Sequence, residues 1–492
     1  MPGLTAKIDH IVVLMLENRS FDCLLGALRP PGADFDGVTK QDFNRYTSAD
    51  GSIQNVFSWN DPTLETGSMK IPDPDPGESF VDMNEQLFGA GGHPAQPPPI
   101  MSGFIDNYMR QPPADAPYDF RAPMHFFTPD QVPVISQLAR SFAVSDRWYA
   151  SAPCQTWPNR FFVHTASAGG YVNNSPAHFP YMMPSIFKRL QSVGRTSTVY
   201  FHDVPQSITL ADQWPFAAKR FRPIECFWDD AEHADLPDYS FIEPRYFTDE
   251  VLGLLPNDQH PPHDVVFGEQ LIAQVYNALR SSPAWKKTLF VITFDEHGGC
   301  FDHAPPPQAP PPYPEPGLDG FLFDRYGVRV PAVIVSPYIP AGTVLRSDSG
   351  GIQQGPIYPF DHTSIIRTLL DRFDPNGGSL TGRDKCAPSL DVALKLDAPS
   401  NDGPDRIDCT VYTPTAEEIQ NAKDRPPNDL QRSLCALTAH LPQAGADVLQ
   451  HIDALKNGLN LLIPECDRVA DAASTVRENL EAFLGSSLTA IG

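Results

Sequence analysis

Two apolar segments of this 492-residue chain run straight into clusters of acidic and amide side chains. Residues 8–16 (IDHIVVLML) are β-branched and apolar almost throughout, and they end in Glu17-Asn18. Residues 288–294 (TLFVITF) have the same character and end in Asp295-Glu296, followed by His-Gly-Gly. Continuous apolar runs of this length are typical of strands that are buried on both faces of a parallel sheet. The sequence therefore predicts a parallel sheet with polar side chains gathered where its strands end.

Strand patterns alternate with helical patterns over most of the chain. Two more strands are predicted over residues 196–201 and 328–336. Apolar residues recur at helical spacing over residues 268–280 and 363–370. This alternation predicts an α/β fold in which a mostly parallel sheet is sandwiched by helices. In such sheets a binding site lies beyond the carboxyl ends of the strands.

The remaining parts of the chain have a different character. Residues 30–130 are rich in Pro, Gly and Asp, and we expect them to form long excursions from the sheet. Strand patterns stop near residue 395, and helical periodicity follows. We therefore predict a catalytic domain over residues 1–395 and an α-helical C-terminal region over residues 396–492. That region either packs on the core or forms a lid for a lipid, and residues 458–463 are among its apolar stretches.

Composition excludes several functions. The chain has 36 Lys+Arg and 60 Asp+Glu, a formal net charge of −24, which disfavours nucleic acid and strongly anionic membranes as partners. No apolar run approaches the roughly 18 residues that a membrane span needs. We expect a soluble protein, cytoplasmic as written, or secreted if a leader is missing. The eight cysteines contain no CxxC pair, and their disulfide status stays open.

The side chains that follow the two strongest strands suit a metal ion. Hard oxygen ligands, which divalent cations prefer, are offered by Glu17, Asn18, Asp295 and Glu296. These side chains could bind one cation together if the two strands are neighbours. The alternative is that these residues only cap the turns that follow. All-oxygen ligation favours a hard ion such as calcium, and zinc and iron stay open.

Thr156 lies in a segment, Pro-Cys-Gln-Thr-Trp-Pro-Asn-Arg, that reads as the start of a helix. Thr is a favoured N-cap, and Pro158 is tolerated in the first helical turn. The same position suits catalysis, because the positive end of the helix dipole and a nearby metal both lower the pKa of a hydroxyl. Free N–H groups at such a helix end can also bind a phosphoryl group.

Four motifs in this order resemble a known family: Glu17-Asn-Arg-Ser-Phe-Asp22, Pro-x-x-Thr156-Trp-Pro-Asn-Arg160, Gln259-His-Pro-Pro262 and Asp295-Glu-His-Gly-Gly299. The family is the bacterial phosphoesterase family of phosphatidylcholine-specific phospholipases C and related acid phosphatases, in the alkaline-phosphatase-like superfamily. The resemblance covers roughly residues 8–375. It implies an alkaline-phosphatase-like α/β fold and metal-dependent phosphoester hydrolysis through a covalent phosphoryl-enzyme.

The resemblance also implies roles for single residues. Thr156 matches the family's nucleophile, and His260 matches the His that contacts the phosphate or the leaving group. The metal ligands would be Glu17, Asn18, Asp295 and Glu296, with the Thr156 oxygen completing the set. Further contacts with the substrate are expected from Asn159, His202, His303 and His362.

Two positions depart from the pattern of many relatives. Cys23 and Glu78 stand where those relatives have His. Glu78 would repel a phosphate dianion but could hold a cationic head group or a metal, which favours a choline-bearing phosphodiester. We therefore predict a metal-dependent phospholipase C that cleaves phosphatidylcholine-like lipids to diacylglycerol and phosphocholine through a phospho-threonine.

The alternatives are a broad-specificity acid phosphatase and a catalytically inactive protein that binds phosphoesters. The expected partner is a phospholipid or a small phosphodiester, with no nucleic acid and at most transient contact with a membrane surface. The oligomeric state stays open.

Overall fold

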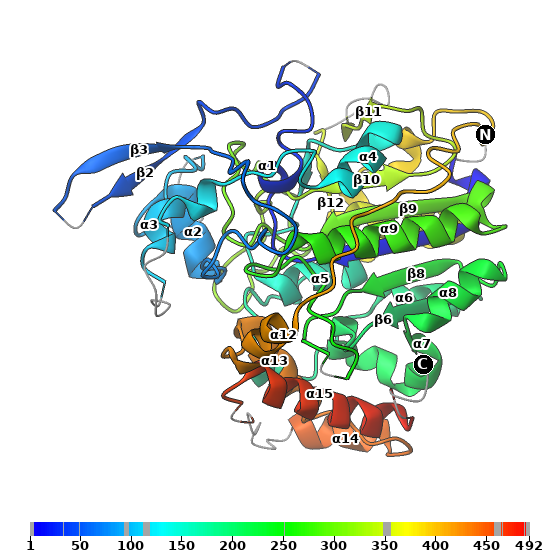
Figure 1. The fold of residues 1–492 in the computed structure, drawn as a ribbon. Coiled ribbons are helices and arrows are strands. Elements are labelled where there is room, and N and C mark those ends of the chain that lie inside the picture. The colour runs from blue at the N-terminus through cyan, green and yellow to red at the C-terminus, as the bar shows by residue number, and fades with distance from the viewer. Residues whose placement is uncertain are drawn as a thin grey trace.

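An eight-stranded sheet runs through the centre of the computed structural model, which describes residues 4–32, 34–48, 50–92, 98–111, 119–249, 251–347, 356–456, 464, 466–486 and 488 (Figure 1). Within these residues the strand order is β11-β4-β10-β9-β1-β8-β6-β7. The central strand, β1 (His10–Leu16), lies between β9 (Thr288–Phe294) and β8 (Tyr239–Glu243), and both are parallel to it. Leu16 pairs with Phe294, so β1 and β9 end side by side, as predicted.

The sheet is parallel on one side of β9 and mixed on the other. β6 (Ser197–Phe201) and β7 (Phe221–Pro223) extend the parallel part beyond β8. β10 (Ala332–Val335) runs antiparallel to β9 and leads to β4 (Ala143–Val144) and β11 (Thr343–Val344). The strand predicted over residues 328–336 is shorter in the structure, because Pro331 has no N–H to donate to a ladder.

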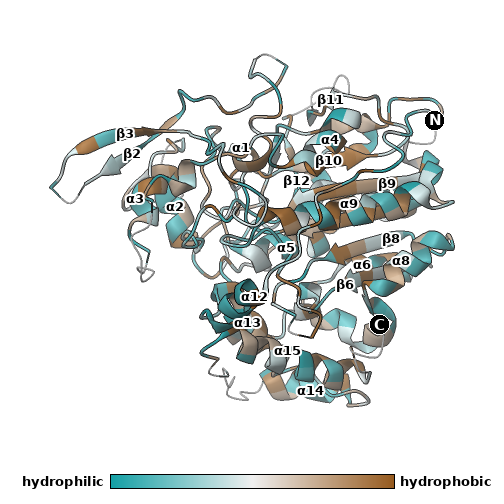
Figure 2. Ribbon diagram, viewed as in Figure 1, coloured by the Kyte–Doolittle hydropathy of each residue, from teal (hydrophilic) through white to brown (hydrophobic). Residues whose placement is uncertain are grey.

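Helices cover both faces of the sheet, which confirms the predicted α/β architecture. On one face lie α4 (Pro133–Ser141), α8 (Glu225–Glu232) and α9 (Val265–Ser281); on the other lie α5 (Thr156–Thr165), α6 (Ile186–Ser192) and α10 (Thr363–Phe373) (Figure 1). All seven residues of β9 and six of the seven in β1 are buried between these layers. Figure 2 shows the hydrophobic residues on strands such as β8 and β10.

Residues 30–130 leave the sheet, as predicted, but they contain regular elements of their own. The hairpin of β2 (Phe43–Thr47) and β3 (Ile53–Phe57) projects from the body beside α2 (Phe80–Phe88) and α3 (Phe104–Tyr108) (Figure 1). Shorter elements before residue 395 include α1 (Phe21–Leu24), β5 (Trp148–Tyr149), α7 (Ala217–Arg220), β12 (Phe360–Asp361) and α11 (Gly382–Cys386).

The C-terminal region is helical, as predicted. It comprises α12 (Ala416–Asp424), α13 (Asp429–Thr438), α14 (Val448–Lys456) and α15 (Val469–Leu484). Leu430, Leu434 and Leu480 of these helices are buried in the same apolar cluster as the central strands. The apolar stretch over residues 458–463 lies outside the described residues.

No helix in the described part of the chain is long and apolar enough to cross a membrane.

Candidate active site

The polar side chains at the ends of β1 and β9 meet in the interior. Glu17, Asn18, Asp295 and Glu296 are all fully buried. The Asn18 backbone N–H donates to Asp295 Oδ1 at 3.0 Å, which joins the two strand ends directly. Asn18 adopts a left-handed conformation (φ 55°), which Asn tolerates better than most residues. Gly298 packs so close that a Cβ there would lie 2.3 Å from the Asn18 carbonyl oxygen, which explains the glycine after the acidic pair.

Several oxygens of this cluster have no hydrogen-bond donor among the described residues. They are Asn18 Oδ1, Asp295 Oδ2 and Glu296 Oε1. A buried acceptor without a partner is costly, and buried charges are normally paired or bound to a metal. Carboxylate and amide oxygens are the ligands that hard divalent cations prefer. The donor set therefore fits a divalent cation at the ends of these strands.

The raised pKa values of the buried carboxyl groups also favour a bound cation. Burial raises the pKa of Glu296 well above its usual range, and the nearby carboxylates of Glu78 and Asp295 raise it further. Burial likewise raises the pKa of Glu17 despite the opposing charge of Arg160. A bound cation would favour the ionised forms of these carboxylates.

Thr156 is the first residue of α5, and its hydroxyl points at this cluster. Thr156 Oγ1 donates to Glu17 Oε2 at 3.3 Å. The N-cap is Gln155, one residue earlier than the sequence suggested, so the Thr156 hydroxyl is not used for capping. The Trp157 N–H donates to Asn174 Oδ1 at 2.7 Å, and Pro158 has no N–H. The first turn therefore has fewer free donors for a phosphoryl group than expected.

Arg160 holds Glu17 in place, a role that the sequence reasoning missed. Glu17 Oε1 accepts from Arg160 Nε at 3.0 Å and from Nη2 at 2.5 Å, and also from Gln206 Nε2 at 2.8 Å. Arg160 Nη1 donates to Glu243 Oε2 at 2.8 Å. Thr156 and Arg160 are four residues apart and share a helix face. That spacing, inside a motif already recognised, was the signal that could have identified Arg160.

His260 lies between the half-buried carboxyl group of Asp75 and the buried carboxyl group of Glu78. Its Nε2 is 3.2 Å from Glu78 Oε1, and its Nδ1 is 3.7 Å from Asp75 Oδ1. Nδ1 also donates to the Pro261 carbonyl at 2.6 Å. Burial opposes the charged imidazole, but Asp75 and Glu78 raise the pKa of His260 well above its usual value. The sequence reasoning singled out Glu78 but not Asp75, which becomes a neighbour only through the fold.

These three residues form a tighter group than the strand-end carboxylates. One ligand atom from each of Asp75, Glu78 and His260 lies within 4.8 Å of the other two. Among the described residues, Asp22, Asp302 and His303 meet the same criterion, whereas Glu17, Asp295 and Glu296 do not.

His362 and His202 each donate a hydrogen bond to a main-chain carbonyl. His362 Nε2 donates to the Asp295 carbonyl at 2.6 Å, and the Trp148 indole N–H donates to its Nδ1 at 3.4 Å. This pairing fixes the neutral ring and links it to a predicted ligand residue. His202 Nδ1 donates to the Glu243 carbonyl at 3.1 Å, and burial lowers the pKa of His202 to about 3.

The side chain of Asn159 is occupied by the loop before α5. Its Oδ1 accepts from the Ala152 N–H at 3.1 Å, and its Nδ2 donates to the Cys154 carbonyl at 2.6 Å. In this structure Asn159 therefore shapes the loop that presents Thr156, and its contact with a substrate stays a prediction.

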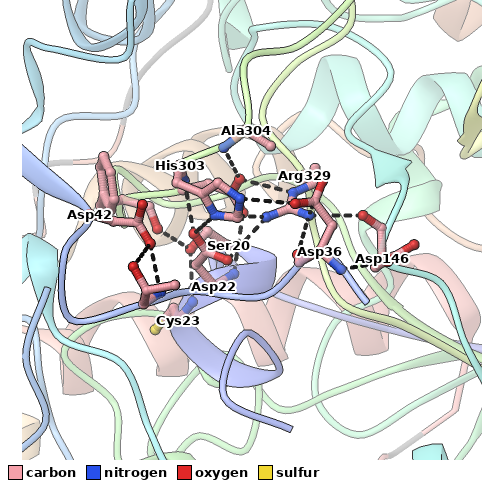
Figure 3. A network of polar contacts seen from close by, with 12 residues as sticks. Ser20, Asp22, Cys23, Asp36, Asp42, Asp146, His303, Ala304 and Arg329 are labelled. Atoms are coloured by element: carbon pink, nitrogen blue, oxygen red, sulfur yellow. Dashed lines mark hydrogen bonds and ion pairs between the residues drawn. The ribbon is translucent and has the colours of Figure 1, made fainter. Parts of the chain in front are cut away.

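His303 belongs to a separate ionic network (Figure 3). Its Nδ1 donates to Asp22 Oδ2 at 2.7 Å and its Nε2 to Asp36 Oδ1 at 3.1 Å. Arg329 donates to Asp22 Oδ1 at 3.0 Å and to Asp302 Oδ1 at 2.9 Å. Each of these carboxylates already has a cationic partner, so this network fits a structural role better than a metal site.

Comparison with known proteins identifies the family of this chain. Residues 8–375 match the Phosphoesterase family. The chain belongs to this family. Non-specific phospholipase C3 of Arabidopsis thaliana is 34% identical over 505 aligned residues, which cover 98% of this chain and 90% of that protein. Phospholipase C B of Mycobacterium tuberculosis is 27% identical over 464 aligned residues, which cover 83% of this chain and 81% of that protein.

Among solved structures, a protein in the alkaline phosphatase superfamily from Vibrio parahaemolyticus can be superposed on part of this chain. The superposition covers 49% of this chain and 59% of that protein's chain, with 12% sequence identity and a TM-score of 0.30.

Membership of the phosphoesterase family confirms the resemblance stated from the motifs. The protein is a phosphoric ester hydrolase.

Proposed function

We propose that this phosphoesterase is a metal-dependent phospholipase C. It cleaves a phosphatidylcholine-like lipid to diacylglycerol and phosphocholine through a phosphorylated Thr156. The observation that carries the proposal is the position of the Thr156 hydroxyl, which is hydrogen-bonded to Glu17 beside the buried, unpartnered oxygens of Asn18, Asp295 and Glu296. A nucleophile next to a cation site suits phosphoryl transfer through a covalent intermediate.

In this proposal Glu17, Asn18, Asp295 and Glu296 hold a divalent cation, with the Thr156 oxygen as a fifth ligand. When bound, the cation would neutralise charge on the phosphoryl oxygens and lower the pKa of the Thr156 hydroxyl. The oxygen ligands favour calcium, and zinc is the next candidate. Arg160 fixes the orientation of Glu17, and His362 fixes the backbone of Asp295.

The first half-reaction is the attack of Thr156 on phosphorus. A bond forms between Oγ1 and phosphorus while the bond from phosphorus to the glycerol oxygen breaks. The hydrogen bond to Glu17 Oε2 gives the Thr156 proton an acceptor. His260, which Asp75 and Glu78 flank, donates a proton to the departing alkoxide, so diacylglycerol leaves neutral.

The second half-reaction reverses these roles. His260 takes a proton from water, the water oxygen attacks phosphorus, and the bond to Thr156 Oγ1 breaks. The proton on Glu17 returns to Thr156, and phosphocholine is released. The consumption of one water and the return of both protons restore the starting enzyme.

The negative charge around Glu78 supports a diester with a cationic head group. Half-buried Asp75 and buried Glu78 lie together, and His260 is the basic residue between them. A phosphodiester carries one negative charge and a phosphomonoester close to two, so these carboxylates repel the monoester more strongly. The two relatives described above are named Non-specific phospholipase C3 and Phospholipase C B, and these names support a phosphodiester substrate without indicating its head group.

Product analysis on defined lipids tests the proposal. With phosphatidylcholine vesicles we expect diacylglycerol and phosphocholine in equal amounts, loss of activity on chelation, and recovery with calcium or zinc. Higher turnover of a phosphomonoester than of a choline phosphodiester would favour the acid-phosphatase alternative. No turnover of either substrate by metal-loaded protein would favour a binding protein.

A further inference from the structure

Two cysteines of the C-terminal helical region face each other at close range. Cys435 lies on α13 and is buried, and Cys466 lies just before α15 and is half-buried. Their sulfur atoms are 3.0 Å apart, although they are 31 positions apart in the chain. Thr475 of α15 also lies beside Cys435. The fold therefore brings two thiols together where α13 packs against the start of α15.

We propose that Cys435 and Cys466 form a reversible disulfide that links α13 to the segment just before α15. Two sulfurs already in contact need little rearrangement to bond, and side-chain geometry is the usual obstacle to a disulfide. Buried Cys23 and Cys300 also lie next to each other, but neither is exposed to a reagent in solution. Cys466 is half-buried, so the Cys435–Cys466 pair is the one that a small disulfide can reach.

The bond forms by thiol–disulfide exchange with a low-molecular-weight disulfide such as oxidised glutathione. The Cys466 thiolate attacks one sulfur of that reagent and releases one glutathione thiolate. Cys435 then attacks Cys466 Sγ and releases the second. The two cysteine protons end on the two released thiols, so the protein is oxidised by two electrons and the reagent is reduced by two. Burial, with Cys466 nearby, raises the pKa of Cys435 to about 12, which favours Cys466 as the first nucleophile.

The disulfide would stabilise a helix that supports the active site. Gln431 of α13 donates to the Tyr246 carbonyl at 2.8 Å, and the Tyr246 hydroxyl donates to Glu243 Oε2 at 2.7 Å. Glu243 in turn holds Arg160. A cross-link over this loop restricts the unfolded chain and so favours the folded state. We therefore expect the oxidised protein to resist unfolding better than the reduced protein.

Peptide mapping tests the bond directly. The full-length protein is incubated with oxidised glutathione, alkylated with iodoacetamide without reduction, and digested with trypsin. Cleavage separates the two cysteines into peptides 433–456 and 457–468. We expect the two peptides joined, at a mass two hydrogens below their sum, and released by dithiothreitol. Exposed Cys386 serves as the internal control and should carry glutathione or the alkyl group.

Thermal unfolding gives a second readout. The wild-type melting temperature should rise by a few degrees on oxidation, and the same treatment should leave the Cys466→Ser variant unshifted. Cys386→Ser is the matched control and should behave like the wild type. Complete alkylation of both Cys435 and Cys466 after oxidation, or separate glutathione adducts on each, would overturn the proposal.

Discussion

Thr156 and Arg160 lie one helical turn apart on α5, and both contact Glu17. Arg160 binds one carboxylate oxygen of Glu17, and the Thr156 hydroxyl binds the other. Glu17 therefore cannot rotate without breaking a buried ion pair, and such a break is costly because it leaves an unpaired charge in the interior. This fixed carboxylate sets the direction of the hydroxyl that we propose as the nucleophile.

Substitution of Thr156 tests that role. Thr156→Ala should lower kcat by at least about a thousandfold, as the loss of other nucleophiles does. Thr156→Ser keeps the attacking oxygen and should retain measurable activity. Steady-state kinetics on a choline phosphodiester provide the measurement, and an unchanged melting temperature shows that both variants are folded. Activity of the alanine variant near the wild-type level would exclude a phospho-Thr156 intermediate.

Glu78 is the residue that we expect to set the preference for a diester. Glu78→His replaces a carboxylate by the imidazole found in many relatives, so repulsion of a phosphate dianion should fall. We expect the ratio of kcat/KM for a monoester to that for a choline diester to rise by about tenfold, which corresponds to roughly 1.4 kcal/mol. Glu78→Gln removes the charge alone and should give part of this change. A ratio that stays constant in both variants would show that Glu78 does not select the substrate.

At the scale of elements, the network around Arg329 joins segments that are distant in the chain. Asp22 lies in α1, Asp302 and His303 follow the acidic loop after β9, and Arg329 precedes β10 (Figure 3). Burial opposes the charge on His303, but hydrogen bonds to Asp22 and Asp36 raise the pKa of His303 to about 11. The network therefore holds the loop after Asp295 and Glu296 through a charged histidine.

This network predicts a pH dependence of stability. The folded protein binds the His303 proton more tightly than the unfolded chain, in which the pKa of His is about 6.5. The stabilisation is full below about pH 6.5 and is lost as the pH rises toward 11. His303→Asn should therefore melt below the wild type at pH 6, and the difference should shrink steadily up to pH 10. Melting curves of both proteins provide the test, and a constant difference would contradict it.

The elements that could be predicted are those whose pattern is local. Strands β1 and β9 and helices α9 and α10 follow from apolar periodicity, and the acidic turns follow from their position after the strands. β8 pairs with β1 but was not predicted, because Ser240 and Glu243 interrupt its apolar residues. The partners of Glu17 and His260 could not be found this way, because Gln206 and Asp75 come close only through long-range packing.

At the scale of the whole molecule, the chain after residue 395 makes two kinds of contact. The segment before α12 lies along α9, where Asn277 Nδ2 donates to the Ile407 carbonyl and Asn277 Oδ1 accepts from the Ile407 N–H, both at 2.9 Å. The helices α12–α15 then pack on the body, where Phe483 contacts Trp214 with ring centroids 6.5 Å apart. The segment around Ile407 is therefore bonded to a helix that covers the central sheet. The domain boundary at residue 395 stays a prediction.

Two truncations separate these contributions and decide whether the helices act as a lid. A chain that ends at residue 395 loses both the contacts along α9 and the helices, and we expect it to be insoluble or unfolded. A chain that ends at residue 414 keeps the hydrogen bonds between Asn277 and Ile407 and should fold with a lower melting temperature.

Gln431 supports Tyr246 and, through it, Glu243. The 414-residue chain lacks this support, so its active site should be less stable. We therefore expect its activity on a soluble phosphodiester and on lipid vesicles to fall in the same proportion. Initial rates on both substrates, measured at equal folded concentration, provide the test. A lid would act differently, since it would admit aggregated lipid without touching the chemistry. Activity that persists on the soluble substrate and falls only on vesicles would therefore assign the helices to lipid access and contradict the packing role.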